Sequence, residues 1–261
     1  MINQRMIPDL LHERLDVYRL FLEVAGFCGG VISSAAETIA ALDHLDRAME
    51  SIGVNLMRAN TRKRGSPMRS AYLDTSIAST HECAASLDVC LARQVVEVGT
   101  HNSGIAKLWR VRGMLLGLKR ASANQVREES APYGTSMFPF AGLDVYQASL
   151  EGVRWTDALF REVSLRARGK QKLDTATTGT VLNIAEGHGR MTAADQNRFM
   201  RTAEEHAFQT VLLLDLMAAR REIPESRIAE GKAIQTRVIS MLHKWCAKNG
   251  QKNENAVDDD G

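Results

Sequence analysis

The sequence contains few aromatic residues and few prolines, and charge of one sign does not dominate it. Of its 261 residues, 5% are Phe, Trp or Tyr and five are Pro. The formal net charge is only +2, so a surface that binds nucleic acid would have to come from local clusters of cations. The hydrophobic content of 44% is enough for the core of one large domain or two small ones.

Several classes of site have no counterpart in the sequence. The four cysteines form no C-x-x-C pair and no Cys/His spacing suited to zinc, so we expect reduced, packed thiols and neither metal nor cofactor. The Glu-x-x-His pairs of di-iron bundles are also missing. No segment approaches the roughly 18 unbroken apolar residues of a membrane span. The N-terminus lacks a basic segment followed by an apolar one, and we therefore expect a cytoplasmic protein with no membrane partner.

Apolar residues recur at helical spacing almost throughout the chain, and no convincing period-two run appears between turns. This pattern predicts an all-α protein. In residues 122–142, two prolines, two glycines and several small polar residues break the helical period, and we predict a linker there. Residues 251–261 lack an apolar anchor and contain three consecutive aspartates, which predicts a disordered acidic tail.

Short patterns recur at a nearly constant separation along the chain. The tetrapeptide LDVY begins at Leu15 and again at Leu143. Three further pairs share this separation to within one position: Asn55 and Asn183, Arg62 and Arg190, and Tyr72 and Phe199. We interpret the chain as a tandem duplication that gives two tandem antiparallel four-helix bundles, a divergent one over 1–121 and a second over 143–250.

Helix boundaries can be predicted within each unit. Ser66 with Pro67, and Thr192 with Asp195, mark the starts of the third helices, while Pro224 suits the first turn of the last helix. The expected helices cover 9–31, 35–60, 67–98 and 103–121 in the first unit, and 143–167, 171–187, 193–221 and 225–248 in the second.

The segment VLNIAEGHGR at 181–190, followed by the helix that begins RFMRTAEEHAF, carries a resemblance to a known family. The second unit resembles the four-helix-bundle family of the 23S rRNA intervening-sequence protein and the accessory variability determinant (Avd) of diversity-generating retroelements. The first unit resembles it only faintly, with Arg58 and Ala59 in place of Glu and Gly. Glu205 and His206 stand where the family usually has Gly and Ser. The matching residues are Asn183, Ile184, Ala185, Glu186, Gly187, Gly189, Arg190 and Phe199.

The resemblance implies a function as well as a fold. Proteins of this family form small homo-oligomeric rings and are thought to bind RNA. Avd has no catalytic activity of its own and acts with a reverse transcriptase and its template RNA. The resemblance therefore implies a non-catalytic RNA-binding accessory protein that acts with a reverse transcriptase and assembles into a ring.

The motif can also be interpreted from its chemistry. The amide of Asn183 lies on an apolar stripe and needs a partner, because leaving it unpaired would cost about 1–3 kcal/mol. Glu186 can accept hydrogen bonds from the following loop or from the third helix, while Gly187 and Gly189 permit left-handed backbone and end the helix. Asn55 occupies the corresponding position in the first unit. We interpret these residues as a structural clasp for the turn rather than an active site.

Two runs of cations lie at predicted loops, one in each unit, with no acidic residue inside either run. Arginine and lysine in such a cluster can bind phosphates, although a solvated surface is the ordinary interpretation of a charge run. Since aromatic residues do not interleave with them, we expect recognition of structured RNA rather than stacking on single strands. The predicted nucleic-acid-binding residues are Arg58, Arg62, Lys63, Arg64, Arg69, Arg166, Arg168, Lys170, Lys172 and Arg190.

Two alternative functions remain open at this point. A ribonuclease of the HEPN type carries an Arg, four to six residues and then a His; Arg201 with His206 and Arg237 with His243 fit this spacing. Such pairs also arise by chance in a sequence rich in arginine. The other alternative is an oligomeric scaffold for protein partners, in which the basic loops contact an acidic protein surface.

Overall fold

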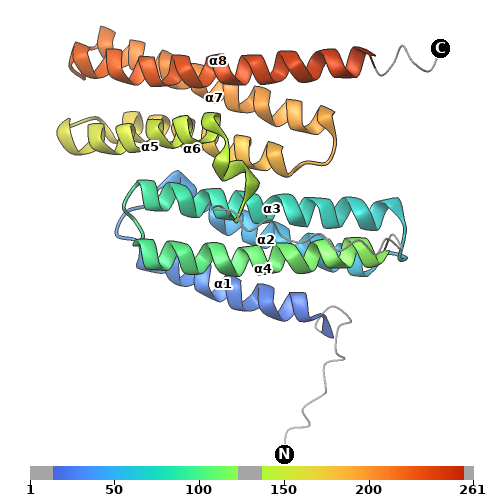
Figure 1. Cartoon of the computed structure of the whole chain (residues 1–261). Helices are drawn as coiled ribbons and strands as arrows, with labels where there is room; N and C mark the ends of the chain where they lie inside the picture. The colour runs from blue at the N-terminus through green and yellow to red at the C-terminus, as the bar shows by residue number, and fades with distance from the viewer. Residues whose placement is uncertain (1–13, 123–136, 256–261) are drawn as a thin grey trace, which may run out of the picture.

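The computed structural model describes residues 14–122 and 137–255, with side chains described as far as residue 248, and within these ranges all regular structure is helical (Figure 1). The prediction of an all-α fold is therefore confirmed. The first half contains α1 (Asp16–Ser34), α2 (Ala40–Asn60), α3 (Pro67–Ala92) and α4 (Val98–Ser122). The second contains the short 3-10 helix η2 (Pro139–Gly142), then α5 (Asp144–Glu162), α6 (Ala167–Gly189), α7 (Ala193–Ala219) and α8 (Glu225–Asn255).

Each half packs its four helices as a bundle. Helix α1 contacts α2 and α4, and α3 contacts the same two helices, so the four close on one another. The second half repeats this arrangement, with α5 and α7 each packed against α6 and α8. The helices alternate in direction along the chain (Figure 1). Bundle packing is thus observed in both halves.

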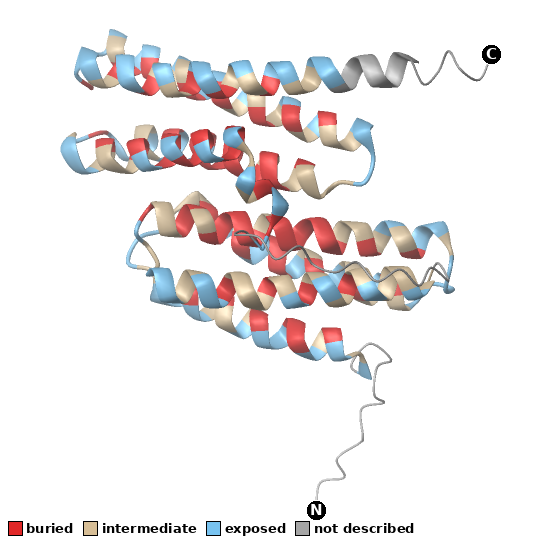
Figure 2. Cartoon of the chain, in the orientation of Figure 1, coloured by how far each residue is buried: buried red, intermediate tan, exposed pale blue. Residues whose placement is uncertain are grey.

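The two halves are joined by a broad contact rather than by a linker alone. Helix α3 packs against α6 and α5, and α2 also touches α6. The larger cluster of buried apolar residues includes members of α1 to α4 as well as α5 to α8, and buried residues continue across the junction in Figure 2. A smaller cluster surrounds Trp155 in the second half. The protein therefore has a core that the two halves share.

The end of the predicted linker is part of this core. Phe138 and Phe140 are 2% and 0% exposed, and the Phe140 ring lies 4.9 Å from that of Tyr146. Apolar side chains in an irregular segment carry no periodic signal, which is why the sequence pattern did not predict their burial. Residues 123–136 of the predicted linker lie outside the described residues. In the predicted tail, α8 continues to Asn255, and 256–261 are not described.

The third helices of the two halves begin in the same way. Ser66 Oγ accepts a hydrogen bond from the N–H of Arg69 at 3.3 Å, and Thr192 Oγ1 accepts one from the N–H of Asp195 at 3.1 Å. These are N-caps, since a side-chain oxygen satisfies a free N–H of the first turn. The predicted starts of α3 and α7 are confirmed. Pro224 immediately precedes α8 rather than lying in its first turn.

The third helices also end in the same way. Each is followed by an arginine and then by a residue with left-handed backbone, Gln94 at φ 58° and Arg221 at φ 55°. The N–H of Val95 donates to Cys90 O at 2.8 Å, and the N–H of Glu222 donates to Met217 O at 2.9 Å. This hydrogen-bond pattern is that of a Schellman motif. The shared ends support the duplication hypothesis, which stays a prediction.

Helix α1 has the length and composition of a helix that could cross a membrane, judged by those two properties alone, and it is the one such helix in the described ranges. One third of its most apolar window is buried inside the protein. The sequence criterion of about 18 unbroken apolar residues did not identify α1 as such a helix. Core helices pass the same test, and Val24 and Cys28 of α1 are buried in the shared core.

Candidate nucleic-acid interface

The two repeated asparagines make the same contact. Asn183 Nδ2 donates to the carbonyl oxygen of Gly179 at 2.8 Å, and Asn55 Nδ2 donates to that of Ser51, also at 2.8 Å. Each amide therefore finds its partner one helical turn earlier in its own helix. The need for a hydrogen bond is met without a ligand or a second helix.

Glu186 closes the turn between α6 and α7 through a side chain. It forms an ion pair with Arg190, whose guanidinium lies 4.6 Å from the centre of the Phe199 ring. Gln196 Nε2 donates to Arg190 O at 2.8 Å, which fixes the same turn. Burial and the nearby Glu82 raise the pKa of Glu186, and Arg190 opposes the rise. Arg190, predicted to bind nucleic acid, is thus half-buried and already paired.

Gly187 and Gly189 serve close packing rather than left-handed backbone. Among the described glycines, positive φ occurs only at Gly65, and the two glycines of the motif lie in the last turn of α6. A Cβ on Gly187 would come within 2.9 Å of Phe199 Cβ, and one on Gly189 within 2.7 Å of His81 Nδ1. The prediction that α6 ends at these glycines is confirmed. The prediction of left-handed backbone was wrong, because it considered the turn and not the neighbouring helices.

His81 lies where the motif meets the first half. Its Nε2 accepts a hydrogen bond from Arg112 Nε at 2.9 Å, and the residue is 2% exposed. Burial, followed by the charges of Arg112 and His188, lowers the pKa of His81 to about 3. Burial and Arg112 lower the pKa of His188 as well. A neutral, buried imidazole that accepts a fixed hydrogen bond has a structural role.

The first basic run lies at the turn between α2 and α3. The side chains of Arg62, Lys63 and Arg64 are exposed, and none has a carboxylate partner among the residues that the structure describes. Arg58 is exposed on the last turn of α2, with its guanidinium 5.9 Å from the centre of the Tyr72 ring. Four of the five predicted cations therefore face solvent together.

Arg69, the fifth residue of this run, is buried instead. Its Nη1 donates to Ala59 O at 2.5 Å and its Nε donates to Ser122 Oγ at 2.9 Å. Burial and the charge of Arg64 lower its pKa. Arg69 therefore ties the end of α2 to the end of α4, and it does not present its guanidinium to a ligand.

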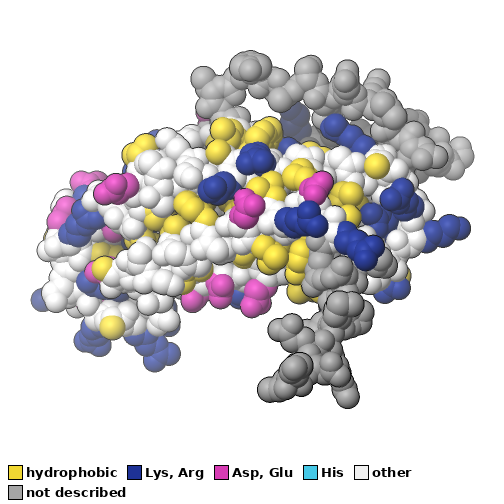
Figure 3. All heavy atoms as spheres, turned by 90° about the horizontal axis from the view of Figure 1, so that it is seen from below, with side chains coloured by type: hydrophobic (Ala, Val, Ile, Leu, Met, Phe, Trp, Pro, Cys, Tyr) yellow, Lys and Arg dark blue, Asp and Glu magenta, His cyan; other side chains and the backbone are white. Residues whose placement is uncertain are grey.

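The surroundings of the turn are also basic. Lys119 and Arg120 occupy the last turn of α4, and Lys119 pairs with Asp74 at 2.5 Å. Basic residues at helix C-termini are ordinarily explained by the helix dipole, and Lys119, Arg120 and Arg58 fit that explanation. On the face seen in Figure 3, Lys and Arg side chains lie at this end of the molecule, and others lie in the middle and at the opposite end.

The second basic run lies at the start of α6. Arg168 and Lys172 are exposed, while Arg166 lies 3.7 Å from Glu222. Lys170 is half-buried and donates to Phe160 O at 3.3 Å. With Arg220 at the end of α7, three of these cations surround a hollow of about 380 Å³ whose apolar wall consists of Leu213, Leu216 and Met217.

The structure does not bring the two runs together. Helices α3 and α6 pack antiparallel, because Arg93 at the end of α3 pairs with Asp174 near the start of α6, and His81 lies against Gly189 near the end of α6. The first run is therefore at the far end of α3 from the second (Figure 1). At about 1.5 Å per residue, the stretch of α3 from 69 to 93 alone spans about 36 Å.

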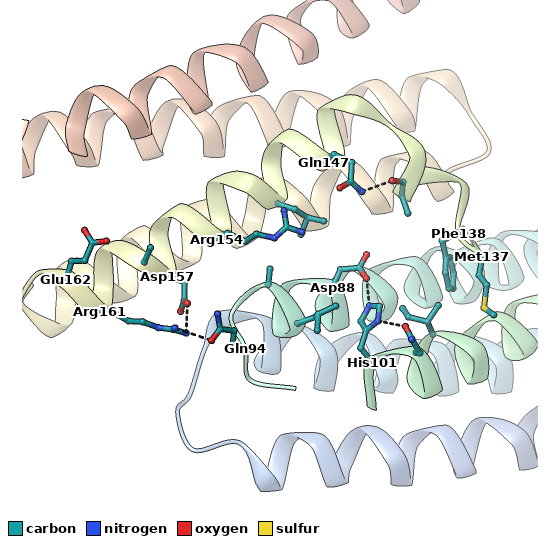
Figure 4. A pocket seen from close by; sticks show the side chains of 17 residues that line it. Asp88, Gln94, His101, Met137, Phe138, Gln147, Arg154, Asp157, Arg161 and Glu162 are labelled. Atoms are coloured by element: carbon teal, nitrogen blue, oxygen red, sulfur yellow. Dashed lines mark hydrogen bonds and ion pairs between the residues drawn. The ribbon is translucent and has the colours of Figure 1, made fainter. Parts of the chain in front are cut away.

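A cleft of about 920 Å³ lies between α5 and the facing ends of α3 and α4 (Figure 4). Asp88 on its wall accepts hydrogen bonds from His101 Nε2 at 2.6 Å and from Tyr146 Oη at 2.7 Å. Burial acts to lower the pKa of His101, but its bonds to Asp88 and Asn102 outweigh burial and raise it. Both ring nitrogens are engaged, and none of the 17 lining residues is Ser, Thr, Cys or Lys. This network ties the two halves together, and the repeated LDVY, which contains Tyr146, was its only sequence signal.

The four residues of the ribonuclease alternative, Arg201, His206, Arg237 and His243, line none of the described hollows. The His206 ring packs on α6, where a Cβ on Gly179 would lie 2.8 Å from it, whereas Arg201 is exposed. His243 is on the surface, 3.5 Å from Glu204. Neither histidine lines the cleft beside α5 or the hollow at Arg220. Within the described ranges, no group of three or more His, Cys, Asp or Glu side chains is placed to hold a metal ion.

No protein-family model, characterised protein or solved structure matches this chain. The resemblance noted from the motif of the second half therefore stays a hypothesis.

Proposed function

We propose that the protein is a non-catalytic accessory protein that binds structured RNA through the turn between α2 and α3. The observation that carries the proposal is the group Arg62, Lys63 and Arg64, which is exposed and has no carboxylate partner in the described part of the chain. Three adjacent cations without anions repel one another. A phosphate backbone would relieve this repulsion and release the counterions bound to the RNA.

The local backbone favours an anion at the same place. Helix α3 begins at Pro67 with no acidic residue in its first turn, so its positive dipole end is not neutralised by a side chain. Arg58 adds a further exposed cation beside the turn. The ring of Tyr72 lies beneath Arg58 and is only partly exposed, which favours contacts to phosphates over base stacking.

Binding measured as a function of salt tests the proposal. Replacing Arg62, Lys63 and Arg64 by Ala should weaken binding of an RNA hairpin about tenfold or more. The logarithm of the binding constant falls as the logarithm of the salt concentration rises, and each lost phosphate contact should make this slope shallower by about 0.9. A matched control replaces three other exposed cations, Arg110, Lys244 and Lys248, and should bind as the unaltered protein does.

Two results would contradict the proposal. One is unchanged affinity and salt slope in the turn variant. The other is an equal loss in both triple variants, which would indicate attraction by overall charge rather than a site. The RNA should also remain intact during incubation, since the proposed role is non-catalytic.

The reverse-transcriptase partner is a separate part of the proposal and has a different basis. It rests only on the resemblance of residues 181–190 to the accessory variability determinant. Co-purification of the protein with the product of an adjacent reverse-transcriptase gene would test it, and the lack of such a gene would remove its basis.

A further inference from the structure

Helix α7 carries an apolar stripe that no part of the described chain covers. Its three residues are spaced by four, so they lie on one face of the helix. Their exposed fractions are large for such side chains. The stripe consists of Phe208, Leu212 and Leu216, which are 54%, 57% and 39% exposed.

The equivalent face of α3 is covered by the second half of the chain. The register between α3 and α7 is set by their ends, where Arg93 and Gln94 correspond to Arg220 and Arg221. In this register, the exposed stripe corresponds to three buried residues of α3: His81, Ala85 and Val89. Helix α7 therefore presents to solvent the face that α3 uses to contact α6.

A buried ion pair marks the contact between α3 and α6. Arg93 Nη2 bonds to Asp174 Oδ1, and the Arg93 side chain is 2% exposed. The other carboxylate oxygen of Asp174 accepts a hydrogen bond from the N–H of Ala40, the first residue of α2, at 2.8 Å. Two donors of the first half, a guanidinium and a helix N-terminus, thus hold one carboxylate of the second half.

Both donors recur in the second half. Arg220 corresponds to Arg93 and is exposed. The start of α6 at Ala167 corresponds to the start of α2 at Ala40 to within one position, since the register set by Asn55 and Asn183 matches Ala40 to Arg168. No side chain caps the start of α6, and its first turn contains no acidic residue. The hollow of about 380 Å³ lies at this place and is lined by Arg220 and by Glu222, whose carboxylate pairs with Arg166. The second half therefore has the donors of a carboxylate site. In the first half, the equivalent donors are already bonded to Asp174.

The matching carboxylate recurs on the outer face of α2. Asn55 and Asn183 make the same hydrogen bond and thereby set the register between α2 and α6. Asp174 then corresponds to Asp46, which is exposed. In the same way, Leu182 is 2% exposed in the shared core, and its counterpart Val54 is 44% exposed.

We propose that the α7 face of one copy of the protein binds the α2 face of a second copy, in the geometry of the contact between α3 and α6. Arg220 of one copy would pair with Asp46 of the other, and Leu212 would pack on Val54. Along its helix, Arg220 lies about 12 Å from Leu212, and Asp46 lies the same distance from Val54. Both pairs can therefore form in one antiparallel register. Because each chain carries one copy of each face, the contact is head to tail and builds a closed ring or an open chain.

Charge and polarity favour a second copy over RNA as the occupant. The α2 face carries exposed Asp43, Asp46 and Glu50, which complement the cations at the start of α6 and the end of α7. A phosphate backbone would leave the apolar stripe of α7 uncovered. The contact also continues a type of interface that this chain already forms within itself.

The mass of nuclease-treated full-length protein in solution tests the proposal. Sedimentation should show oligomers at micromolar concentration, with Arg220→Asp and Asp46→Arg each shifting the protein to monomer. The double variant should restore assembly, because the exchanged charges again attract. Leu212→Asp should dissociate the oligomer, whereas Leu22→Asp, on an exposed leucine of α1, should not. A monomeric unaltered protein, or a double variant that stays monomeric, would overturn the proposal.

Cysteine pairs test the register. In a Cys246→Ser background, a Leu212→Cys and Val54→Cys double variant should form disulfide-linked multimers under mild oxidation. Either cysteine alone should give no linked dimer. Linkage through Leu212→Cys alone would indicate a two-fold contact between α7 helices and would overturn the head-to-tail arrangement. Since no RNA is present in these experiments, their failure would leave the proposed RNA binding untouched.

Discussion

Lowering the pH from 7 to 5 should weaken the fold through His81. Its pKa is about 3 in the folded protein and 6.5 when unperturbed, so the unfolded chain binds the proton first as the pH falls. The contribution of this residue to stability is therefore complete above pH 6.5 and is lost progressively as the pH falls toward about 3. Since a tenfold change in an equilibrium constant corresponds to about 1.4 kcal/mol, the loss between pH 7 and pH 5 from this residue is about 2 kcal/mol.

Urea unfolding at both pH values, followed by circular dichroism and tryptophan fluorescence at a fixed protein concentration, would measure this loss. His81→Gln keeps an acceptor for Arg112 but does not titrate, so its loss should be about 2 kcal/mol smaller than that of the unaltered protein. His243→Gln changes a histidine side chain that is 78% exposed and serves as the control. If the loss in His81→Gln came within about 0.5 kcal/mol of the unaltered value, the scatter of a neutral surface substitution, the reasoning would be refuted.

Four substitutions, one of them a control, test other parts of the packing by urea unfolding. Gly189→Ala should destabilise the protein by about 1–3 kcal/mol because its methyl group meets the imidazole on α3, whereas Gly26→Ala, with open space around it, should stabilise α1 by up to about 1 kcal/mol. Arg93→Ala should cost about 3–5 kcal/mol because it leaves the buried carboxylate of Asp174 without its charge partner. Ser66→Ala should cost about 1 kcal/mol through loss of the cap of α3.

Each of these predictions has an outcome that contradicts it. Equal effects of the two glycine substitutions would show that helix propensity alone determines them. A cost below about 1 kcal/mol for the arginine variant, as for an exposed ion pair, would mean that water reaches the carboxylate. An unchanged midpoint for the serine variant would show that water satisfies the free N–H group equally well.

Helices could be predicted from the sequence because their signals are local. Apolar spacing identified all eight long helices of the described ranges, and the caps at Ser66 and Thr192 placed two of their starts. The burial of Phe138 and Phe140 depends on helices distant in sequence, so no local pattern could indicate it. The same reason explains Gly189, whose neighbour His81 belongs to the other half of the chain.

The candidate site could be predicted only in part. Exposure of Arg62, Lys63 and Arg64 agrees with their place in a charge run between two helices. Arg69 belongs to the same run, yet it is buried. Its guanidinium donates to the carbonyl oxygen of Ala59 and to the hydroxyl of Ser122, which only the folded chain brings close to it. The spacing of charges in the sequence predicts a basic surface. It does not identify which of the cations are buried in hydrogen bonds within the protein.

The shared core limits how the protein can be divided. Helix α3 contributes its buried face to the second half as well as to the first, so a fragment that ends near residue 122 would leave Ala85 and Val89 open to water. The matching fragment from 137 onward would expose Leu182 and Ile184. Severed halves would therefore tend to adhere to each other or to aggregate, and experiments that localise an activity should vary single residues in the intact chain rather than shorten it.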